Sequence, residues 1–173
     1  MRLPNAIIGG IFKAGTTAVF EYLSAHPEVC VSSVKETNFF LREYTGEPQH
    51  DIMTYEKYFI HCKESSKIIL EASPIYLVGG RAGAQVVANR IDQLLDQPKI
   101  LFILRNPVDR IYSAYNFQME RLNLPKTLTF EDYIDLCLQK ETADNPSDLE
   151  FGVERLNALQ YGCYAHYLKE YLE

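Results

Sequence analysis

The chain is 173 residues long, 47% of these residues are hydrophobic, and its formal net charge is −6. This length suits one globular domain that buries a sizeable single core. The acidic balance argues against a nucleic-acid partner, which usually requires a basic surface, and no stretch approaches the ~20 apolar residues that span a bilayer.

Three strands and one helix are predicted in the first part of the chain. Residues 6–8 form a short apolar run that leads into a glycine-rich loop, and apolar residues then recur at helical spacing. Residues 29–31 and 67–71 are compact apolar runs, as expected for buried strands. The polar, tyrosine-rich segment 42–67 is predicted to cover the site as a loop with a short helix around 54–59.

Helices and one further strand alternate in the second part of the chain. We predict a helix over residues 81–95, a strand over 99–105, and a helix that opens at Pro107, because proline fits the first turn of a helix. Thr129 and Asp132 form a weaker version of the capping box in front of a further helix.

Short apolar strands that alternate with helices predict an α/β fold in three layers. We expect a mainly parallel sheet flanked by helices, similar to the fold of P-loop NTPases. The sequence has no visible internal repeat, linker or low-complexity segment.

The glycine-rich turn between the first strand and the first helix is a candidate anion site. Such a turn presents consecutive backbone N–H groups and the positive helix end to an anion, and phosphate is the natural ligand. Its spacing differs from the usual NTPase phosphate loop, because Lys13 precedes Gly15 by two positions. No strand that ends in a Mg²⁺-binding aspartate is evident, which also disfavours an ordinary NTPase. By itself, the turn can also be a purely structural connection.

Four motifs resemble those of the sulfotransferases that use 3′-phosphoadenosine 5′-phosphosulfate (PAPS). The run KAGTTAVFEYLSAHPEV is similar to the family's 5′-phosphosulfate loop, and ILRNPVDRIYSAY is similar to its 3′-phosphate motif. The segments KETNFF and EASPIYL resemble its Glu-x-x-Phe-Phe and Glu-x-[ST]-Pro-x-Tyr elements. The resemblance covers about residues 7–171 and is closer to the glycosaminoglycan-type and bacterial branch than to the cytosolic phenol and steroid enzymes.

The resemblance implies a sulfotransferase that takes its sulfuryl group from PAPS as co-substrate, without a metal. Lys13 is expected to stabilise charge on the leaving phosphate oxygen, and Glu36 is expected to act as general base on the acceptor. The implied acceptor is a hydroxyl or an amine of a carbohydrate or another small molecule. The residues expected to bind the nucleotide are Lys13, Ala14, Gly15, Thr16, Thr17, Arg105 and Ser113.

For several of these residues, a purely structural role remains an alternative to the functional one. Glu36 can simply pair with Lys35 at the surface, because most glutamates and lysines are exposed, and Lys13 can be a solvated lysine. Arg105 is expected to end a buried strand, where its guanidinium fork suits a phosphate. Arg110 could replace it as phosphate ligand, although we expect Arg110 to pair with acidic neighbours.

The acceptor side and the extent of the domain are less well defined. Ala72 stands where several glycosaminoglycan-type members carry a lysine, so one substrate-side charge is absent. The family usually continues into another strand and a basic loop, and we expect residues 1–173 to form a single sulfotransferase domain that lacks both. Five aromatic residues either form an acceptor wall or pack the covering segment onto the sheet: Phe39, Phe40, Tyr44, Tyr55 and Tyr58.

The cysteines lie far apart with no CxxC pair, which suggests neither a zinc site nor a dense disulfide framework. A reducing compartment is therefore expected. The apolar run at the N-terminus is too short for a signal peptide, and cytoplasmic is the default expectation for this chain.

Two other functions remain open from the sequence. One is a P-loop nucleotide or small-molecule kinase, which would depend on Mg²⁺. The other is a catalytically incomplete fragment, which would bind 3′-phosphoadenosine 5′-phosphate (PAP) weakly or not at all. The acidic balance gives no support for a strongly anionic polysaccharide as acceptor.

Overall fold

The computed structural model describes residues 2–41, 52–79, 82–121, 125–142 and 156–172. The chain divides into two compact units. The first unit comprises residues 1–104 and 165–173, and the second comprises residues 105–164.

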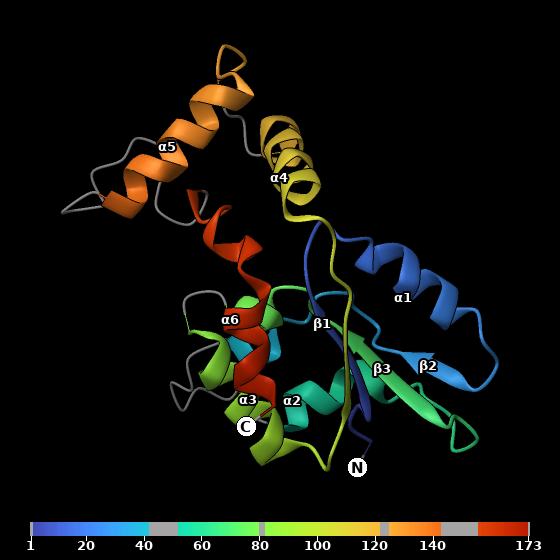
Figure 1. The fold of residues 1–173 in the computed structure, drawn as a ribbon. Helices are drawn as coiled ribbons and strands as arrows, with labels where there is room; N and C mark the ends of the chain where they lie inside the picture. Colours follow the sequence, from blue (N-terminus) through green and yellow to red (C-terminus); the bar gives the residue numbers. More distant parts are fainter. Residues whose placement is uncertain (1, 42–51, 80–81, 122–124, 143–155, 173) are drawn as a thin grey trace. The chain divides into compact units, whose positions relative to one another are not determined.

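A four-stranded parallel sheet forms the centre of the first unit (Figure 1). Its strand order is β2-β3-β1-β4, and each neighbouring pair is parallel. Ile8 lies opposite Ala72 on one neighbouring strand and Leu101 on the other, so the carboxyl ends of these strands lie at one edge of the sheet. The strands are β1 (Ala6–Gly10), β2 (Val29–Val31), β3 (Ile68–Ala72) and β4 (Lys99–Phe102).

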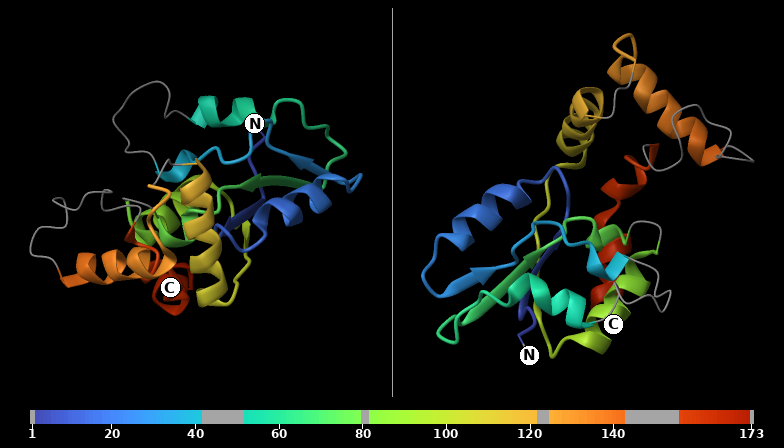
Figure 2. Two further views of the ribbon diagram at one scale, coloured as in Figure 1. Left: turned by 90° about the horizontal axis from the view of Figure 1, so that it is seen from above. Right: turned by 180° about the vertical axis from the view of Figure 1, so that it is seen from behind.

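Apolar side chains leave this sheet on both faces, because successive residues of a strand point to opposite sides. Ile7 and Ile69 pack in one core with residues of α2 and α3, whereas Ile8 and Leu70 pack in another with Phe20 of α1. Figure 2 shows α1 and α2 on opposite sides of the sheet. The predicted α/β fold with a parallel sheet flanked by helices is therefore confirmed. The helical elements are α1 (Thr16–Ser24), η1 (Phe39–Leu41), α2 (Ile52–Glu56), η3 (Lys57–Phe59), η4 (Tyr76–Val78), α3 (Ala84–Leu94) and η8 (Lys169–Tyr171).

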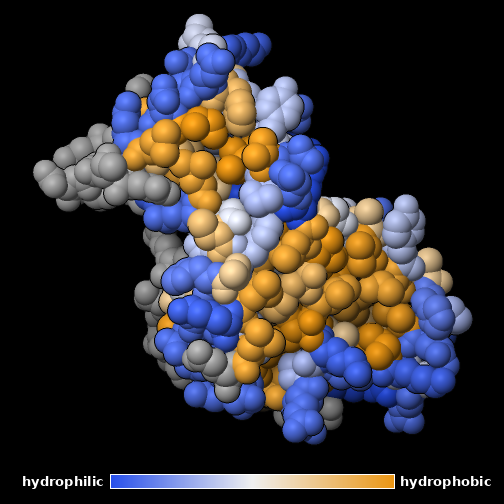
Figure 3. Space-filling model, viewed as in Figure 1, coloured by the Kyte–Doolittle hydropathy of each residue, from blue (hydrophilic) through white to orange (hydrophobic). Residues whose placement is uncertain are grey.

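The strand β4 lies at the edge of the sheet, contrary to our prediction of a buried strand over residues 99–105. It ends at Phe102, and its side chains alternate between exposed and half-buried. Leu101 and Leu104 are each 44% exposed, and Figure 3 shows apolar side chains gathered on this face of the first unit. Within the described residues β4 pairs only with β1, so an apolar sequence typical of a central strand here occupies an edge.

The second unit has a small core of its own, which joins three parts of its sequence. Ile111 of α4 packs with Tyr133 and Cys137 of α5 and with Leu156 and Ala158. The helices of this unit are α4 (Pro107–Arg121), α5 (Phe130–Thr142), η7 (Gln160–Gly162) and the start of α6 (Tyr164–Leu168).

The predicted capping box in front of α5 is confirmed. The Asp132 carboxylate accepts hydrogen bonds from the backbone N–H and the hydroxyl of Thr129, and the Thr129 hydroxyl oxygen accepts one from the Asp132 N–H. The hydroxyl bond, followed by the backbone bond, lowers the pKa of Asp132. Two backbone donors at the helix start are thereby satisfied.

One pair of cysteines forms a disulfide, which the spacing of the cysteines did not indicate. Cys30 of β2 is bonded to Cys62, 32 residues later, while Cys137 and Cys163 are free. The spacing concealed this pair, because only the fold brings β2 beside the segment after η3. The cysteines therefore no longer support a reducing compartment.

Among the described residues, no helix is both long enough and apolar enough to cross a membrane.

Candidate functional site

The loop between β1 and α1 has the conformation of an anion-binding turn. Gly15 precedes the helix with φ of 91°, and no side chain caps the first turn. A Cβ atom added to Gly15 would meet no atom within 4 Å, so the left-handed backbone, and not crowding, requires glycine there. The first N–H groups of a helix lack intrahelical partners and carry partial positive charge, so this turn can receive an anion.

The remaining residues of this loop surround the start of α1. Lys13 is half-buried and has a left-handed backbone with φ of 66°. Ala14 is half-buried and donates its N–H to the Ile11 carbonyl, while Thr16 is buried and Thr17 is exposed. The predicted phosphate-loop residues 13–17 therefore lie together at one helix start.

Glu36 lies on the loop that follows β2, and this loop is attached to the end of β3. The Glu36 N–H donates to the Ala72 carbonyl at 2.9 Å, and the Glu36 backbone is left-handed with φ of 63°. The carboxylate is 51% exposed and accepts a hydrogen bond from the Lys35 ammonium at 2.8 Å. The pairing with Lys35 that we kept as an alternative is thus present, and it leaves half of the side chain accessible.

The phosphate loop and the Glu36 loop emerge at the same edge of the sheet. β1 and β3 are adjacent and parallel, and Ile8 lies opposite Ala72 at their carboxyl ends. The chain enters the phosphate loop after β1, while Glu36 is bonded to Ala72. Ligands of open α/β sheets bind at this edge, so the topology brings a cationic and an anionic candidate residue to one place.

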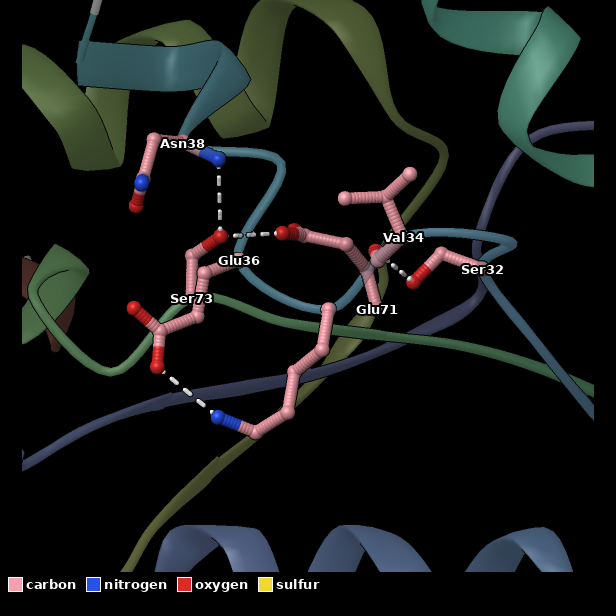
Figure 4. Close-up of polar contacts among 7 residues, drawn as sticks. Ser32, Val34, Glu36, Asn38, Glu71 and Ser73 are labelled. Carbon is pink, nitrogen blue, oxygen red and sulfur yellow. Dashed lines mark hydrogen bonds and ion pairs between the residues drawn. The ribbon is translucent and has the colours of Figure 1, made fainter.

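A buried carboxylate lies beneath the Glu36 loop (Figure 4). Glu71 is 0% exposed and accepts hydrogen bonds from four hydroxyl groups, those of Thr37, Ser73, Tyr76 and Tyr55. Burial raises the pKa of Glu71 to about 7, although the four hydroxyl bonds oppose this rise. The sequence gives no signal for this role, because nothing in the EASPIYL motif distinguishes a buried carboxylate from an exposed one.

Two candidate residues for the nucleotide lie in the second unit. Arg105 is exposed in the loop before α4, three residues after β4 ends, and not at the end of a buried strand as we predicted. Ser113 is half-buried in the second turn of α4.

Arg110, the alternative phosphate ligand, is fully buried in the second unit. Its guanidinium donates to the Ala158 carbonyl, and burial lowers its pKa while Tyr164 opposes this effect. The helical phase of α4 turns this side chain into the interior of the second unit. The expectation of an acidic partner stays a prediction.

The comparison with known families identifies the chain. A family model described as the sulfotransferase domain matches residues 3–173. The chain belongs to the sulfotransferase domain family.

Relatives of this sulfotransferase domain include enzymes named for glycan sulfation. It is 30% identical over 174 residues to the human bifunctional heparan sulfate N-deacetylase/N-sulfotransferase 2. The matched region covers 99% of this chain and 18% of the human protein. It is also 30% identical over 171 residues to the human heparan sulfate glucosamine 3-O-sulfotransferase 3B1, again over 99% of this chain but 38% of that protein. The membrane-associated sulfotransferase kil1 of Dictyostelium discoideum is 31% identical over 139 residues, 80% of this chain and 28% of that protein.

A solved structure supports the same fold. The sulfotransferase from Alicyclobacillus acidocaldarius is 28% identical and superposes with a TM-score of 0.75, covering 99% of this chain and 69% of that one. The sulfotransferase domain described here spans less than two fifths of each curated relative named above.

The aromatic residues near the Glu36 loop mainly pack the covering segment onto the sheet. Phe40 and Tyr55 are 2% and 0% exposed, and the rings of Phe39 and Tyr55 are stacked with centroids 4.2 Å apart. Tyr58 is half-buried at a ring distance of 6.4 Å from Tyr55. Tyr44, the fifth residue of this set, lies outside the described residues.

The alanine that replaces a family lysine is buried in the sheet. Ala72 is 0% exposed and packs with Ile8, Phe20 and Leu70 on the α1 side. A lysine side chain at this position would have to displace these apolar neighbours or bury its charge among them. The small alanine instead allows close packing here.

Among the described residues, one group of side chains brings three potential metal ligands together. Ligand atoms of Cys30, His61 and Cys62 lie within 4.8 Å of one another. The disulfide uses both sulfur atoms, and only the thiolate forms of cysteine ligate metals.

Proposed function

We propose that this domain transfers a sulfuryl group from PAPS to a hydroxyl or amine of a carbohydrate or another small acceptor. The observation that carries the proposal is the shared position of the phosphate loop and the Glu36 loop at the carboxyl ends of β1 and β3. Membership of the sulfotransferase domain family supports the reaction type.

The phosphate loop is proposed to bind the donor. The uncapped N–H groups at the start of α1 and the hydroxyls of Thr16 and Thr17 receive the 5′-phosphate, with Ala14 and Gly15 shaping the turn. The Lys13 ammonium lies beside the bridging oxygen between phosphorus and sulfur. As the sulfur–oxygen bond breaks, this cation stabilises the charge that develops on that oxygen.

Glu36 is proposed to activate the acceptor. Its carboxylate takes the proton of the attacking hydroxyl or amine while the new bond to sulfur forms in line with the leaving oxygen. The products are the sulfated acceptor, protonated Glu36 and PAP. The pairing with Lys35 directs the carboxylate, and its 51% exposure leaves it accessible to an acceptor.

Arg105 and Ser113 are proposed to bind the 3′-phosphate of the donor. The exposed guanidinium of Arg105 can form a bidentate contact with a phosphate. Ser113 adds a hydroxyl from the second turn of α4. In this proposal both units, residues 1–104 with 165–173 and residues 105–164, belong to one sulfotransferase domain, as the extent of the family match supports.

The acceptor chemistry is proposed from the relatives. The name of one relative specifies N-sulfation of heparan sulfate, and that of the other specifies 3-O-sulfation of heparan sulfate glucosamine. An amine and a hydroxyl of an amino sugar are therefore the first acceptors to test. The net charge of −6 favours an acceptor with few negative charges over a heavily sulfated polymer.

Calorimetric titration with PAP, beside ATP with Mg²⁺, tests the donor site. We expect PAP to bind and Lys13→Ala and Arg105→Ala to weaken it ~10- to ~100-fold, as expected for the loss of one charged hydrogen bond. The matched controls Lys126→Ala and Arg121→Ala remove the same charges from exposed positions and should bind PAP like the unaltered chain.

The possible outcomes separate the three functions considered. Preference for Mg-ATP would refute the sulfotransferase proposal in favour of a kinase. A folded chain that binds neither nucleotide would correspond to a catalytically incomplete fragment. If PAP binds, transfer from PAPS to an unsulfated glucosamine oligosaccharide should be lost in Glu36→Gln with PAP affinity unchanged. Unimpaired transfer by this variant would remove Glu36 from the mechanism.

A further inference from the structure

The four hydroxyl bonds to Glu71 come from four different parts of the first unit. Thr37 belongs to the Glu36 loop, Ser73 follows β3, Tyr76 lies in η4 and Tyr55 in α2. Oε1 accepts the bonds of Thr37 at 2.9 Å, Tyr76 at 3.3 Å and Ser73, while Oε2 accepts the bond of Tyr55 at 3.3 Å. Each of the five residues is at least 97% buried, so water cannot replace these partners easily.

Three of these hydroxyls also hold the backbone that follows Glu36. The Ser73 hydroxyl oxygen accepts the N–H of Asn38 at 3.0 Å, as Figure 4 shows. The hydroxyl oxygen of Thr37 accepts the N–H of Phe39 at 3.3 Å. The Tyr76 oxygen accepts the N–H of Phe40 at 3.4 Å.

An ionised carboxylate favours the orientation in which all three hydroxyls donate to it, over the 3.5 Å contact between the Thr37 and Tyr76 hydroxyl oxygens. A hydroxyl has one proton, and when this proton is directed at Oε1 its lone pairs face the backbone N–H groups. Three successive amides of the chain, at positions 38–40, are thus bonded through one hydroxyl each to a single carboxylate oxygen. Hydrogen bonds in such chains polarise one another, so the carboxylate strengthens the outer bonds.

The segment held in this way has an unfavourable backbone. Glu36 and Asn38 both have positive φ, 63° and 51°, in a region that non-glycine residues rarely adopt. The Glu36 N–H donates to the Ala72 carbonyl, and the amides of residues 38–40 donate to the three hydroxyls. We propose that Glu71 is a positioning residue whose carboxylate, acting through Thr37, Ser73 and Tyr76, maintains the left-handed turn that presents Glu36.

Protonation of Glu71 should loosen this turn. A protonated carboxyl must itself donate a proton and loses acceptor capacity, so the hydroxyls can no longer all point at it. The titratable groups in contact with Glu71 are the phenols of Tyr55 and Tyr76, whose pKa values are raised well above the ordinary value by burial and then by the charge of Glu71. Both phenols stay neutral near pH 7, so Glu71, with a pKa of about 7, is the group in this cluster that changes charge there.

Amide hydrogen exchange tests the proposal without any substrate. In the unaltered chain, the amides of residues 38–40 should exchange ~10-fold faster below pH 6 than above pH 8, after correction for intrinsic rates, which is the effect of about one hydrogen bond. Glu71→Gln should remove this pH dependence. Ser73→Ala should speed exchange at Asn38 most, because it deletes only that hydroxyl.

Tyr55→Phe is the matched control for these variants. It deletes a hydroxyl bonded to the same carboxylate, but this hydroxyl holds none of the three amides. The amides of residues 38–40 should stay protected in Tyr55→Phe. The amides of β1 report global folding and should be equally protected in all folded variants. Equal protection of residues 38–40 in Glu71→Gln and in the unaltered chain at both pH values would overturn the proposal.

The catalytic consequence rests on the function proposed above. With PAPS and the unsulfated oligosaccharide, kcat of the unaltered chain should rise with an ionisation near pH 7, and this ionisation should be absent in Glu71→Gln while KM for PAPS stays the same. Failure to bind PAP would refute the sulfotransferase proposal and leave the exchange result standing. If the amides of residues 38–40 exchange faster in Glu71→Gln but the pH profile of kcat is the same as in the unaltered chain, the positioning role alone would be refuted.

Discussion

Replacing Glu71 by glutamine should change how the stability of the protein depends on pH. Burial raises the pKa of Glu71 from 4.5 to about 7 in the folded chain. Between these values the unfolded chain loses the proton while the folded chain keeps it, so stability falls as pH rises. A difference of one in pKa between the two states corresponds to ~1.4 kcal/mol of free energy. The contribution of Glu71 to the free energy of unfolding should therefore fall by ~3 kcal/mol between pH 4.5 and pH 8.

Urea unfolding at pH 4.5, 6 and 8, followed by circular dichroism, measures this effect as the difference between the unaltered chain and Glu71→Gln. At pH 4.5 the free energy of unfolding of the glutamine variant should be equal to or lower than that of the unaltered chain. By pH 8 the difference should have shifted by ~3 kcal/mol in favour of the variant. Glu21→Gln, at an exposed position of α1, should show no such gain. A difference that is constant across the three pH values would mean that the four hydroxyl bonds keep Glu71 ionised throughout, and would refute the reasoning.

Three further changes test individual parts of the fold. Replacing Cys30 and Cys62 by alanine should lower the free energy of unfolding by ~3.5 kcal/mol, because their bond closes a loop with a sequence separation of 32; reductant should then have no further effect on the midpoint of denaturation. Thr129→Ala should cost ~1 kcal/mol by removing the cap of α5, measured as a lower Tm. Gly10→Ala should cost ~2 kcal/mol or more, because the new methyl would lie 2.5 Å from Cβ of Leu77; a Tm equal to that of the unaltered chain would show that η4 can shift.

Local features of the fold could be predicted from the sequence because few residues determine them. The turn at Lys13 and Gly15 follows from a glycine that must adopt positive φ between a strand and a helix. The cap of Thr129 and Asp132 depends on two side chains three residues apart. The α/β class follows from the alternation of apolar strands with helices, which is also a local pattern.

Several errors of the sequence analysis concern burial. The apolar run that became β4 has the composition of a central strand, and only the strand order places it at the edge of the sheet. Arg110 and Arg105 lie five residues apart, and the phase of α4 buries the first whereas the second stays exposed. Charge and composition do not encode these positions, because they depend on which elements pack together.

The sequence by itself indicated the family, and it predicted the phosphate loop and the candidate base Glu36, since each is carried by a short motif. The tertiary structure alone decided that Cys30 and Cys62 meet and that Glu71 is buried among four hydroxyls. The physical reason is that the disulfide joins residues 32 positions apart, and that two of the four hydroxyls, those of Thr37 and Tyr55, lie 34 and 16 positions from Glu71. A carboxylate acquires an unusual pKa, and a loop acquires its support, only when the fold removes water and supplies these distant partners.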